Sequence, residues 1–392
     1  MLEAMLAIIA VPPVILSTCF AVEVLAGLRP LAERGASSER ASTSAVVVIP
    51  AHDEEDSIAE TIAALRAEAG GIADLLVVAD NCSDRTAQIA RAGGARTIVR
   101  TDPAARGKGY ALSFARDDLA KAPPAIVVIV DADCRIDRQS LTALIDAASA
   151  QSRPAQAINL LRPDLAASPF VQMSNFAFML RNLIRQRGLQ RLAGRVHLTG
   201  TGMAFPWTLF SEADLGGGSI VEDLQLGLSL AAQGHGPVLV EGATVWSSAA
   251  STQGTMRQRE RWEGGFLKSA LPAGLRGLWR SVVGFNGRGL VAAIDLCIPP
   301  LVLLVLLDAA ALILLGFAMV SGSTAYPFAA VLAAGGLAGL AVILAWLRAG
   351  RAFASLGAIA QIPLYVARKL PMYARLLLRG APRDWIRTDR VQ

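Results

Sequence analysis

The chain has 392 residues, of which 53% are hydrophobic and only 18% are charged, and its formal net charge is +5. This composition is too apolar for an ordinary soluble enzyme and indicates that part of the chain lies in a membrane. The positive charges are scattered and are not interleaved with aromatic residues, so no nucleic-acid partner is expected.

The first predicted element is an apolar stretch, residues 4–27, within an N-terminal segment 1–28. A bilayer core needs about 20 helical residues, so this stretch predicts a transmembrane helix, and it is too long for a cleavable signal peptide. Glu3 is the only charged residue before this stretch, whereas the positively charged Arg29, Arg34 and Arg40 follow it. The positive-inside rule therefore places the next domain in the cytoplasm, in a multi-pass protein of the inner (cytoplasmic) membrane.

Residues 42–264 form the predicted enzyme domain, where short β-branched runs alternate with segments of helical period. The runs are VVVIP (46–50), LLVVAD (75–80), RTIV (96–99) and AIVVIVDAD (125–133). This alternation predicts an α/β fold with a mostly parallel sheet, whose sites open at the carboxyl ends of the strands.

Asp131 and Asp133 end the fourth of these runs. Alternate residues of a strand point to the same side, so the two carboxylates are expected to converge. Such a pair needs a cation, and Mg²⁺ or Mn²⁺, held by carboxylates and diphosphate oxygens, fits this need. A solvated strand end is the alternative interpretation.

Two further polar motifs precede helical segments. The stretch RGKG (106–109) can bring backbone N–H groups and the Lys108 ammonium to a phosphate, although a Gly-rich turn alone is a weak signal. Glu222 and Asp223 open an amphipathic stretch, where they either complement the helix macrodipole or supply a general base for an acceptor hydroxyl.

The stretch QRERW (258–262) allows two interpretations. Thr255 and Gln258 have the spacing of a helix capping box, which needs no ligand. On a helix, however, Gln258, Arg261 and Trp262 share one face, with Arg259 and residue 260 expected to point elsewhere. An amide, a guanidinium and an indole on one face suit a phosphate and a sugar ring together.

The C-terminal segment, residues 265–392, is predicted to begin with a basic amphipathic helix in the membrane interface. Two transmembrane spans follow at 289–319 and 325–347, and residues 352–378 are expected to form an interfacial or re-entrant helix before a basic tail. The apolar segments contain three acidic residues that are predicted to be isolated, Glu23, Asp295 and Asp308, which argues against a transporter.

The chain has four cysteines, Cys19, Cys82, Cys134 and Cys297. They lack metal-ligand or paired spacing, so they are expected to be free thiols.

In this order the motifs resemble those of the membrane-embedded family 2 glycosyltransferases, which include cellulose, chitin, hyaluronan and poly-N-acetylglucosamine synthases and ceramide glucosyltransferases. The family pattern is an aspartate after the second strand, a DxD, a later ED pair and Gln-x-x-Arg-Trp. The stretches VVVIPAHDEE, RGKGYAL and GTGMAF also match, and the resemblance covers roughly residues 45–265. It implies a GT-A fold, a nucleotide-sugar donor, most often a UDP-sugar, and a divalent metal.

The resemblance also implies roles for individual residues. Asp223 is the expected catalytic base, with Glu222 beside it, and Asp133 is the expected metal ligand. Thr201, Gly202 and Trp262 are expected at the acceptor. The expected donor-binding residues are Pro50, His52, Glu54, Asp80, Lys108, Gly109, Asp131, Asp133, Gln258 and Arg261. Asp53 departs from the asparagine that is common in relatives, so no role is carried over to it.

The resulting hypothesis is an inverting transferase that moves a sugar to a membrane-associated lipid or lipid-linked saccharide, in glycolipid or exopolysaccharide synthesis. A processive polysaccharide synthase is the alternative, because the missing spans of a polymer channel can come from a partner subunit or an oligomer. A third hypothesis is an inactive nucleotide-sugar-binding membrane subunit.

Overall fold

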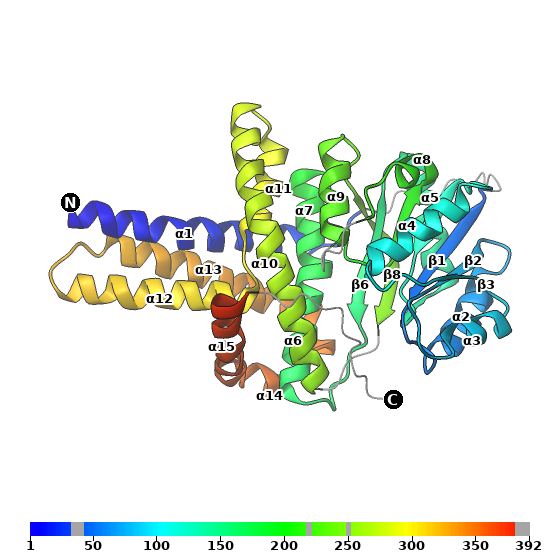
Figure 1. Ribbon diagram of the computed structural model, residues 1–392. Helices are drawn as coiled ribbons and strands as arrows, with labels where there is room; N and C mark the ends of the chain where they lie inside the picture. The colour runs from blue at the N-terminus through cyan, green and yellow to red at the C-terminus, as the bar shows by residue number, and fades with distance from the viewer. Residues whose placement is uncertain (33–42, 217–221, 248–251, 381–392) are drawn as a thin grey trace. The chain divides into compact units, whose positions relative to one another are not determined.

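The computed structural model describes residues 1–32, 43–216, 222–247 and 252–380 (Figure 1). The predicted signals at Arg34, Arg40 and the basic tail therefore lie outside the described residues. The chain divides into two compact units. One contains residues 1–29, 163–194 and 266–381, and the other contains residues 30–162 and 195–265.

The second unit is built on one eight-stranded sheet with the order β3-β2-β1-β4-β7-β6-β8-β5. The first four of these strands are parallel, β7 runs antiparallel to both of its neighbours, and β8 is parallel to β6. The predicted GT-A class of α/β fold is confirmed. The strands are β1 (Ala45–Ala51), β2 (Asp74–Asp80), β3 (Arg96–Arg100), β4 (Ile126–Ile129), β5 (Cys134–Ile136), β6 (Ala155–Leu161), β7 (Met203–Pro206) and β8 (Val238–Ser247).

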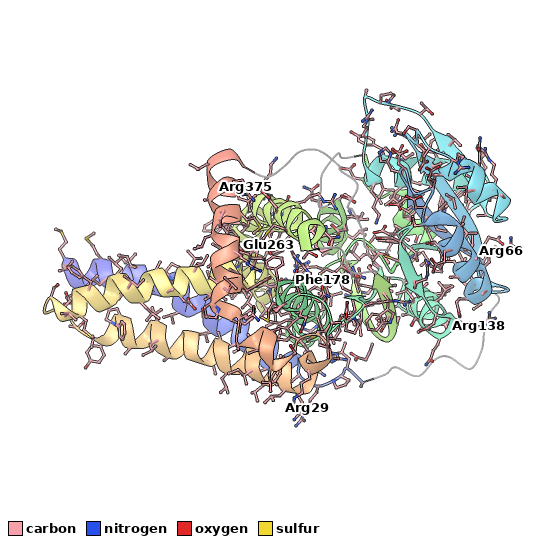
Figure 2. The ribbon with its side chains drawn as sticks, turned by 90° about the horizontal axis from the view of Figure 1, so that it is seen from below. Arg29, Arg66, Arg138, Phe178, Glu263 and Arg375 are labelled. Carbon is pink, nitrogen blue, oxygen red and sulfur yellow. The ribbon has the colours of Figure 1, made fainter. Side chains whose placement is uncertain are left out.

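Helices cover both faces of this sheet because its strands are apolar on both sides. Packed on one face are α2 (Ile58–Ala69), α3 (Thr86–Ala92) and α5 (Arg138–Gln151), where Arg138 donates to the Gly70 carbonyl at the end of α2 (Figure 2). The opposite face carries α4 (Lys108–Leu119), α8 (Trp207–Ser211) and α9 (Glu222–Ala232). The polar ends of β1, β2 and β4 therefore remain available for a site.

The first unit is helical. Its elements are α1 (Leu2–Gly27), α6 (Pro169–Met179), the π-helix η1 (Leu180–Arg185), α7 (Gln186–Ala193), α11 (Gly287–Cys297), α12 (Leu301–Val320), α13 (Tyr326–Arg348), η2 (Gly350–Ala352), α14 (Leu356–Ile359) and α15 (Ile362–Arg379). Among the described residues, α1, α12 and α13 are long and apolar enough to cross a membrane, with mean hydropathies of 2.3, 2.7 and 2.3. Figure 1 shows α12 and α13 as a hairpin beside α1.

The predicted span 289–319 is wrong in its first third. The structure breaks it into α11 and α12 at residues 298–300, where Pro299 and Pro300 cannot donate backbone hydrogen bonds to a continuous helix. Residues 352–378 form η2, α14 and α15, which are not among the helices apolar enough to cross.

The acidic residues of the apolar segments are not isolated, contrary to the sequence prediction. Arg185 of η1 donates to Glu23 of α1 at 2.6 Å and also to Asp295 of α11. Ser17 donates to Asp308 at 2.7 Å. The partners are far apart in the chain, so sequence spacing could not reveal these pairs.

Close helix packing accompanies the Arg185 contacts. A Cβ atom added to Gly27 of α1 would overlap the Ile184 carbonyl oxygen, and one added to Gly188 of α7 would overlap the Glu23 carbonyl oxygen. The two backbones are therefore in direct contact, an approach that only glycine permits.

QRERW lies inside one continuous helix, α10 (Thr252–Val283). Residues up to 265 of this helix belong to the second unit and those from 266 belong to the first. Thr255 stands within the helix, three residues after its start, so the capping-box interpretation is wrong.

Candidate active site

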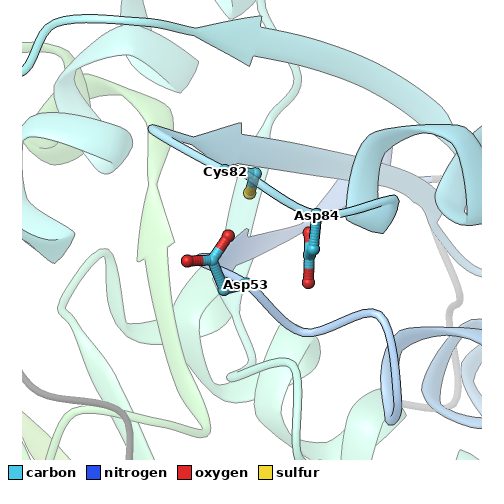
Figure 3. A group of neighbouring side chains, drawn as sticks. All are labelled: Asp53, Cys82 and Asp84. Carbon is cyan, nitrogen blue, oxygen red and sulfur yellow. The ribbon is translucent and has the colours of Figure 1, made fainter.

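Asp53 lies in the loop after β1, and Cys82 and Asp84 lie in the loop after β2 (Figure 3). Side-chain hydrogen bonds join these two loops. Asp53, which has a φ of 52°, accepts from the Ser83 backbone N–H at 2.7 Å, and Asp84 accepts from the Glu55 backbone N–H at 3.0 Å. The Cys82 Sγ lies within 4.8 Å of an oxygen of each carboxylate, and burial raises the pKa of its thiol. These acidic groups bind loop backbone, which gives Asp53 a structural role that the sequence did not reveal.

Asp80 ends β2 and is only 1% exposed. Its Oδ1 accepts from the Arg100 guanidinium at 2.6 Å, whereas its Oδ2 is buried without a hydrogen-bond partner among the described residues. A buried acceptor without a donor is costly, so this oxygen suits a ligand N–H. His52 contacts the Asp80 carbonyl through Nδ1 at 2.7 Å, which brings two of the predicted donor-binding residues together.

Arg100, which belongs to none of the predicted motifs, is also part of the site. It lies opposite Asp80 in the register of β2 and β3, and its side chain is 11% exposed. The sequence signal for Arg100 was a basic residue at the end of the strand that follows LLVVAD.

Two further predicted donor-binding residues lie near the start of the second unit. Glu54 accepts from the Ser57 hydroxyl at 2.6 Å where α2 begins, and Pro50 is buried in β1. Their contacts with a nucleoside stay predictions.

The DxD stretch forms a turn between β4 and β5, and not the end of a strand as predicted. The Cys134 N–H donates to the Asp131 carbonyl at 3.0 Å, which closes this turn. The carboxylates of Asp131 and Asp133 still converge, because an oxygen of each lies within 4.8 Å of the other and of Cys134 Sγ. Burial raises the pKa of Cys134 to about 11, so its thiol is neutral and the available charged ligands are carboxylate oxygens.

Lys108 begins α4 directly after Gly107, whose φ of 136° requires glycine. Its side chain is 13% exposed and donates to the Asp131 carboxylate and, at 2.7 Å, to the Gly200 carbonyl. Gly109 is buried in the first turn of the same helix. The predicted phosphate-binding lysine is therefore held against a carboxylate of the DxD turn.

Glu222 and Asp223 begin α9, in agreement with the helix-start interpretation. A Cβ atom on Gly200 would lie 3.4 Å from Asp223 Oδ2 and 4.0 Å from Lys108 Nζ, so these groups meet around a residue that has no side chain. Burial, and then the charge of Asp223, raise the pKa of Glu222 from 4.5 to about 7.

Thr201 and Gly202 connect this cluster to the sheet. The Asp131 N–H donates to the Thr201 hydroxyl at 3.1 Å, and the Gln156 side chain donates to the Thr201 carbonyl at 2.9 Å. Gly202 has a φ of 63°, and a Cβ atom there would lie 2.6 Å from Val245. These contacts position Asp131, and an acceptor-binding role for the two residues stays a prediction. Gln156 was missed, although a glutamine in an apolar strand was a usable signal.

The side chain of Arg259 in QRERW is oriented differently from the prediction. Arg259 is 7% exposed and its guanidinium lies 5.3 Å from the centroid of the Trp262 ring, so it does not point away from Trp262. The two residues are three apart and therefore share a helical face. Burial lowers the pKa of Arg261, and the charge of Glu222 partly offsets this, which places Arg261 within electrostatic range of the ED pair. Gln258 is half-buried.

A family model described as "Glycosyltransferase like family 2" matches residues 43–265. The chain belongs to this family, as the resemblance predicted. No curated protein matches the chain.

Solved structures of glycosyltransferases are similar to it, and two of them follow. The mannosyltransferase PcManGT from Pyrobaculum calidifontis, in complex with GDP-Man and Mn²⁺, matches with a TM-score of 0.56 and 18% identity over 93% of this chain and 98% of that chain. Glucosyl-3-phosphoglycerate synthase from Mycobacterium tuberculosis, in complex with Mn²⁺, UDP and phosphoglyceric acid, has a TM-score of 0.38 and 17% identity over 58% of this chain and 78% of that chain. The first likeness supports a shared fold over nearly the whole length of both chains.

Proposed function

We propose that the protein is an inverting glycosyltransferase that moves a sugar from a nucleotide-sugar donor to a membrane-associated lipid or lipid-linked saccharide. The observation that carries this proposal is the meeting of Lys108, Asp131 and Asp223 around Gly200. This cluster offers a cation for phosphate, carboxylates for a metal and a base within one site.

Asp80 is the proposed contact for the donor base. Its unpartnered Oδ2 can accept a ring N–H, which uracil and guanine carry, while Arg100 keeps the other oxygen neutralised. A UDP-sugar is the first candidate donor. A GDP-sugar is the second, because it offers the same ring N–H and because PcManGT was solved with GDP-Man.

Asp133, beside Asp131, is the proposed ligand of Mg²⁺ or Mn²⁺. The site fits such an ion because its charged ligands are carboxylate oxygens and the neighbouring Cys134 thiol is neutral. A bound divalent ion supplies positive charge to the diphosphate as negative charge develops there. Arg261 is proposed to add a guanidinium to the same task.

Asp223 is proposed to take the proton of the acceptor hydroxyl. The hydroxyl oxygen forms a bond to the anomeric carbon as the bond from that carbon to the diphosphate breaks, which inverts the configuration and releases the nucleoside diphosphate. The proton remains on the Asp223 carboxylate and is then lost to water. Glu222 lies beside this base at the start of α9, and burial, followed by the charge of Asp223, raises the pKa of Glu222.

The acceptor is proposed to reach Trp262, whose indole can pack on a sugar ring.

The chain has three helices suited to crossing a membrane among its described residues, and Arg29 follows the first of them. We therefore place the enzyme in the inner membrane with its catalytic domain in the cytoplasm. With so few spans, a single transfer is favoured over a processive synthase, which would need a partner subunit or an oligomer to complete a channel.

A donor screen on purified protein tests the proposal. Release of the nucleoside diphosphate is measured for each nucleotide sugar, with and without a lipid extract and with EDTA. We expect metal-dependent release for one donor that the extract stimulates. A ladder of products from labelled donor would instead favour the processive synthase. Donor binding without release or transfer, under every condition, would favour an inactive binding subunit.

A further inference from the structure

We propose that Lys108 is the resident counter-cation of the acidic site, and that it keeps a divalent metal from Asp131 until a nucleoside diphosphate draws its ammonium away. The inference rests on the proposed function and adds an order of events to it. Donor and metal enter together, and neither is expected to occupy the site tightly alone.

The first support is the position of Lys108. Its ammonium donates to the Asp131 carboxylate and to the Gly200 carbonyl, and its side chain is 13% exposed. The ammonium therefore lies inside the site and not over it in solvent. Two of its three N–H donors are used on these groups, which holds it in place.

The second support is the charge of the surroundings. The Asp131 and Asp133 carboxylates lie within 4.8 Å of each other, and the Asp223 carboxylate and the Lys108 ammonium both lie close to Gly200. A divalent ion bound between Asp131 and Asp133 would compete with the ammonium for the same carboxylate, and the two positive charges would repel each other. Lys108 thus lowers the affinity of the empty site for metal.

The third support is the chemistry of the ligand that could remove this block. Lys108 is the first residue of α4, and the N-terminus of a helix favours a phosphate. A lysine stem is flexible, so a diphosphate can attract the ammonium away from Asp131 and leave that carboxylate for the metal. Because binding free energies are reciprocal, the diphosphate should tighten metal binding by the same factor by which metal tightens nucleotide binding.

The test measures Mn²⁺ affinity by electron paramagnetic resonance on the full chain in detergent, without nucleotide and with UDP or GDP. The main variant is Lys108→Gln, which keeps a donor for the Gly200 carbonyl but removes the charge. We expect it to bind Mn²⁺ without nucleotide about tenfold more tightly than the wild type, within the usual range of such couplings. We also expect the nucleotide to improve Mn²⁺ binding less in this variant than in the wild type.

Two variants serve as controls. Lys108→Arg keeps the positive charge and should retain the weak nucleotide-free affinity. Lys121→Gln removes an exposed lysine that pairs with Asp118, and it should behave as the wild type. Thermal melting establishes that each variant is folded, and Lys108→Met is a second neutral variant if Lys108→Gln does not fold.

The outcomes separate the inference from the proposed function. If the wild type binds Mn²⁺ with nucleotide, but a folded neutral variant shows the wild-type affinity without it, the counter-cation role is overturned and the transferase proposal stands. If no Mn²⁺ binds under any condition, both are overturned.

Discussion

The guanidinium of Arg259 lies over the indole ring of Trp262, 5.3 Å from the ring centroid. Arg259 is 7% exposed, which is unusual for an arginine in a helix, and desolvation strengthens a cation–π contact. One face of the indole is therefore occupied from within the protein. The contact restrains the ring that we propose meets the acceptor.

Replacing Arg259 with Met should weaken acceptor binding, because the indole loses this restraint. A desolvated cation–π contact contributes about 2 kcal/mol, so the acceptor KM should rise by up to about thirtyfold while the donor KM stays near its wild-type value. Arg259→Lys should recover part of the loss. Steady-state kinetics with each substrate varied in turn measure this, and Arg276→Met, at an exposed position of the same helix, is the matched control. Equal changes in both KM values would contradict the interpretation.

Asp223→Asn should bind donor but fail to transfer sugar, because the amide cannot take the proton of the acceptor hydroxyl. General-base catalysis contributes about 10²- to 10⁴-fold to a rate, and a loss of that size is expected in kcat. Calorimetric titration with UDP, or with GDP if that is the donor base, reports binding independently. Asp117→Asn, at an exposed position in α4, is the control. Near-normal turnover in Asp223→Asn would remove it from the base role.

Glu222 should make stability depend on pH. Its folded-state pKa of about 7 lies above its usual 4.5, so its ionised form is the less favourable one in the folded protein. The wild type should therefore lose stability as pH rises from about 4.5 to about 7, with no further loss from this group at higher pH. Glu222→Gln escapes this effect, and its Tm relative to wild type should increase between pH 5 and pH 8, by an amount equivalent to at most about 3 kcal/mol. A Tm difference independent of pH would refute the burial argument.

Arg100→Met should disrupt both stability and donor binding, because it leaves the buried Asp80 carboxylate without its cation. Removing one partner of a buried ion pair lowers the free energy of unfolding by about 3–5 kcal/mol, which urea unfolding can measure.

Asp80→Asn in the wild-type background should be less destabilised than Arg100→Met but should bind UDP and GDP less tightly than the wild type, while its affinity for ADP or CDP changes little. Unchanged selectivity among the four nucleotides would show that Asp80 does not read the base.

Arg185→Met should destabilise the helical unit, because Glu23 and Asp295 would lose the guanidinium that both accept from. The loss expected for a broken buried pair is again about 3–5 kcal/mol. A triple variant that also carries Glu23→Gln and Asp295→Asn should regain much of this stability, since no uncompensated charge remains. Thermal melting in detergent compares the variants, and a triple variant no more stable than Arg185→Met would argue against the ionic explanation.

Much of the fold was predictable from local pattern. The alternation of β-branched runs with helical segments gave the α/β class, because both depend on periodicities within about ten residues. The break at Pro299 and Pro300 also has a local signal, because neither proline can donate a helix hydrogen bond, although the apolar run around them is long enough for one span. The grouping of residues 163–194 with the helical unit depends on long-range contacts and left no local signal.

The candidate site was predicted well in membership but less well in geometry. The motifs identified Asp80, Asp131, Lys108 and Asp223, and the structure brings the last three together. The pairing of Asp80 with Arg100 depends on strand register, and that of Glu23 with Arg185 depends on helices far apart in the chain. Such contacts follow from tertiary packing, which periodicity and spacing do not encode.

The contact between Gly27 and Gly188 makes the ionic and steric parts of the helical unit inseparable. A single methyl group at either position would push α1 away from η1 and α7, and the same displacement would draw Glu23 out of reach of Arg185. A change as mild as glycine to alanine is thus expected to act as a charge mutation. Helix α1 would then carry an uncompensated carboxylate without any ionisable residue having been altered.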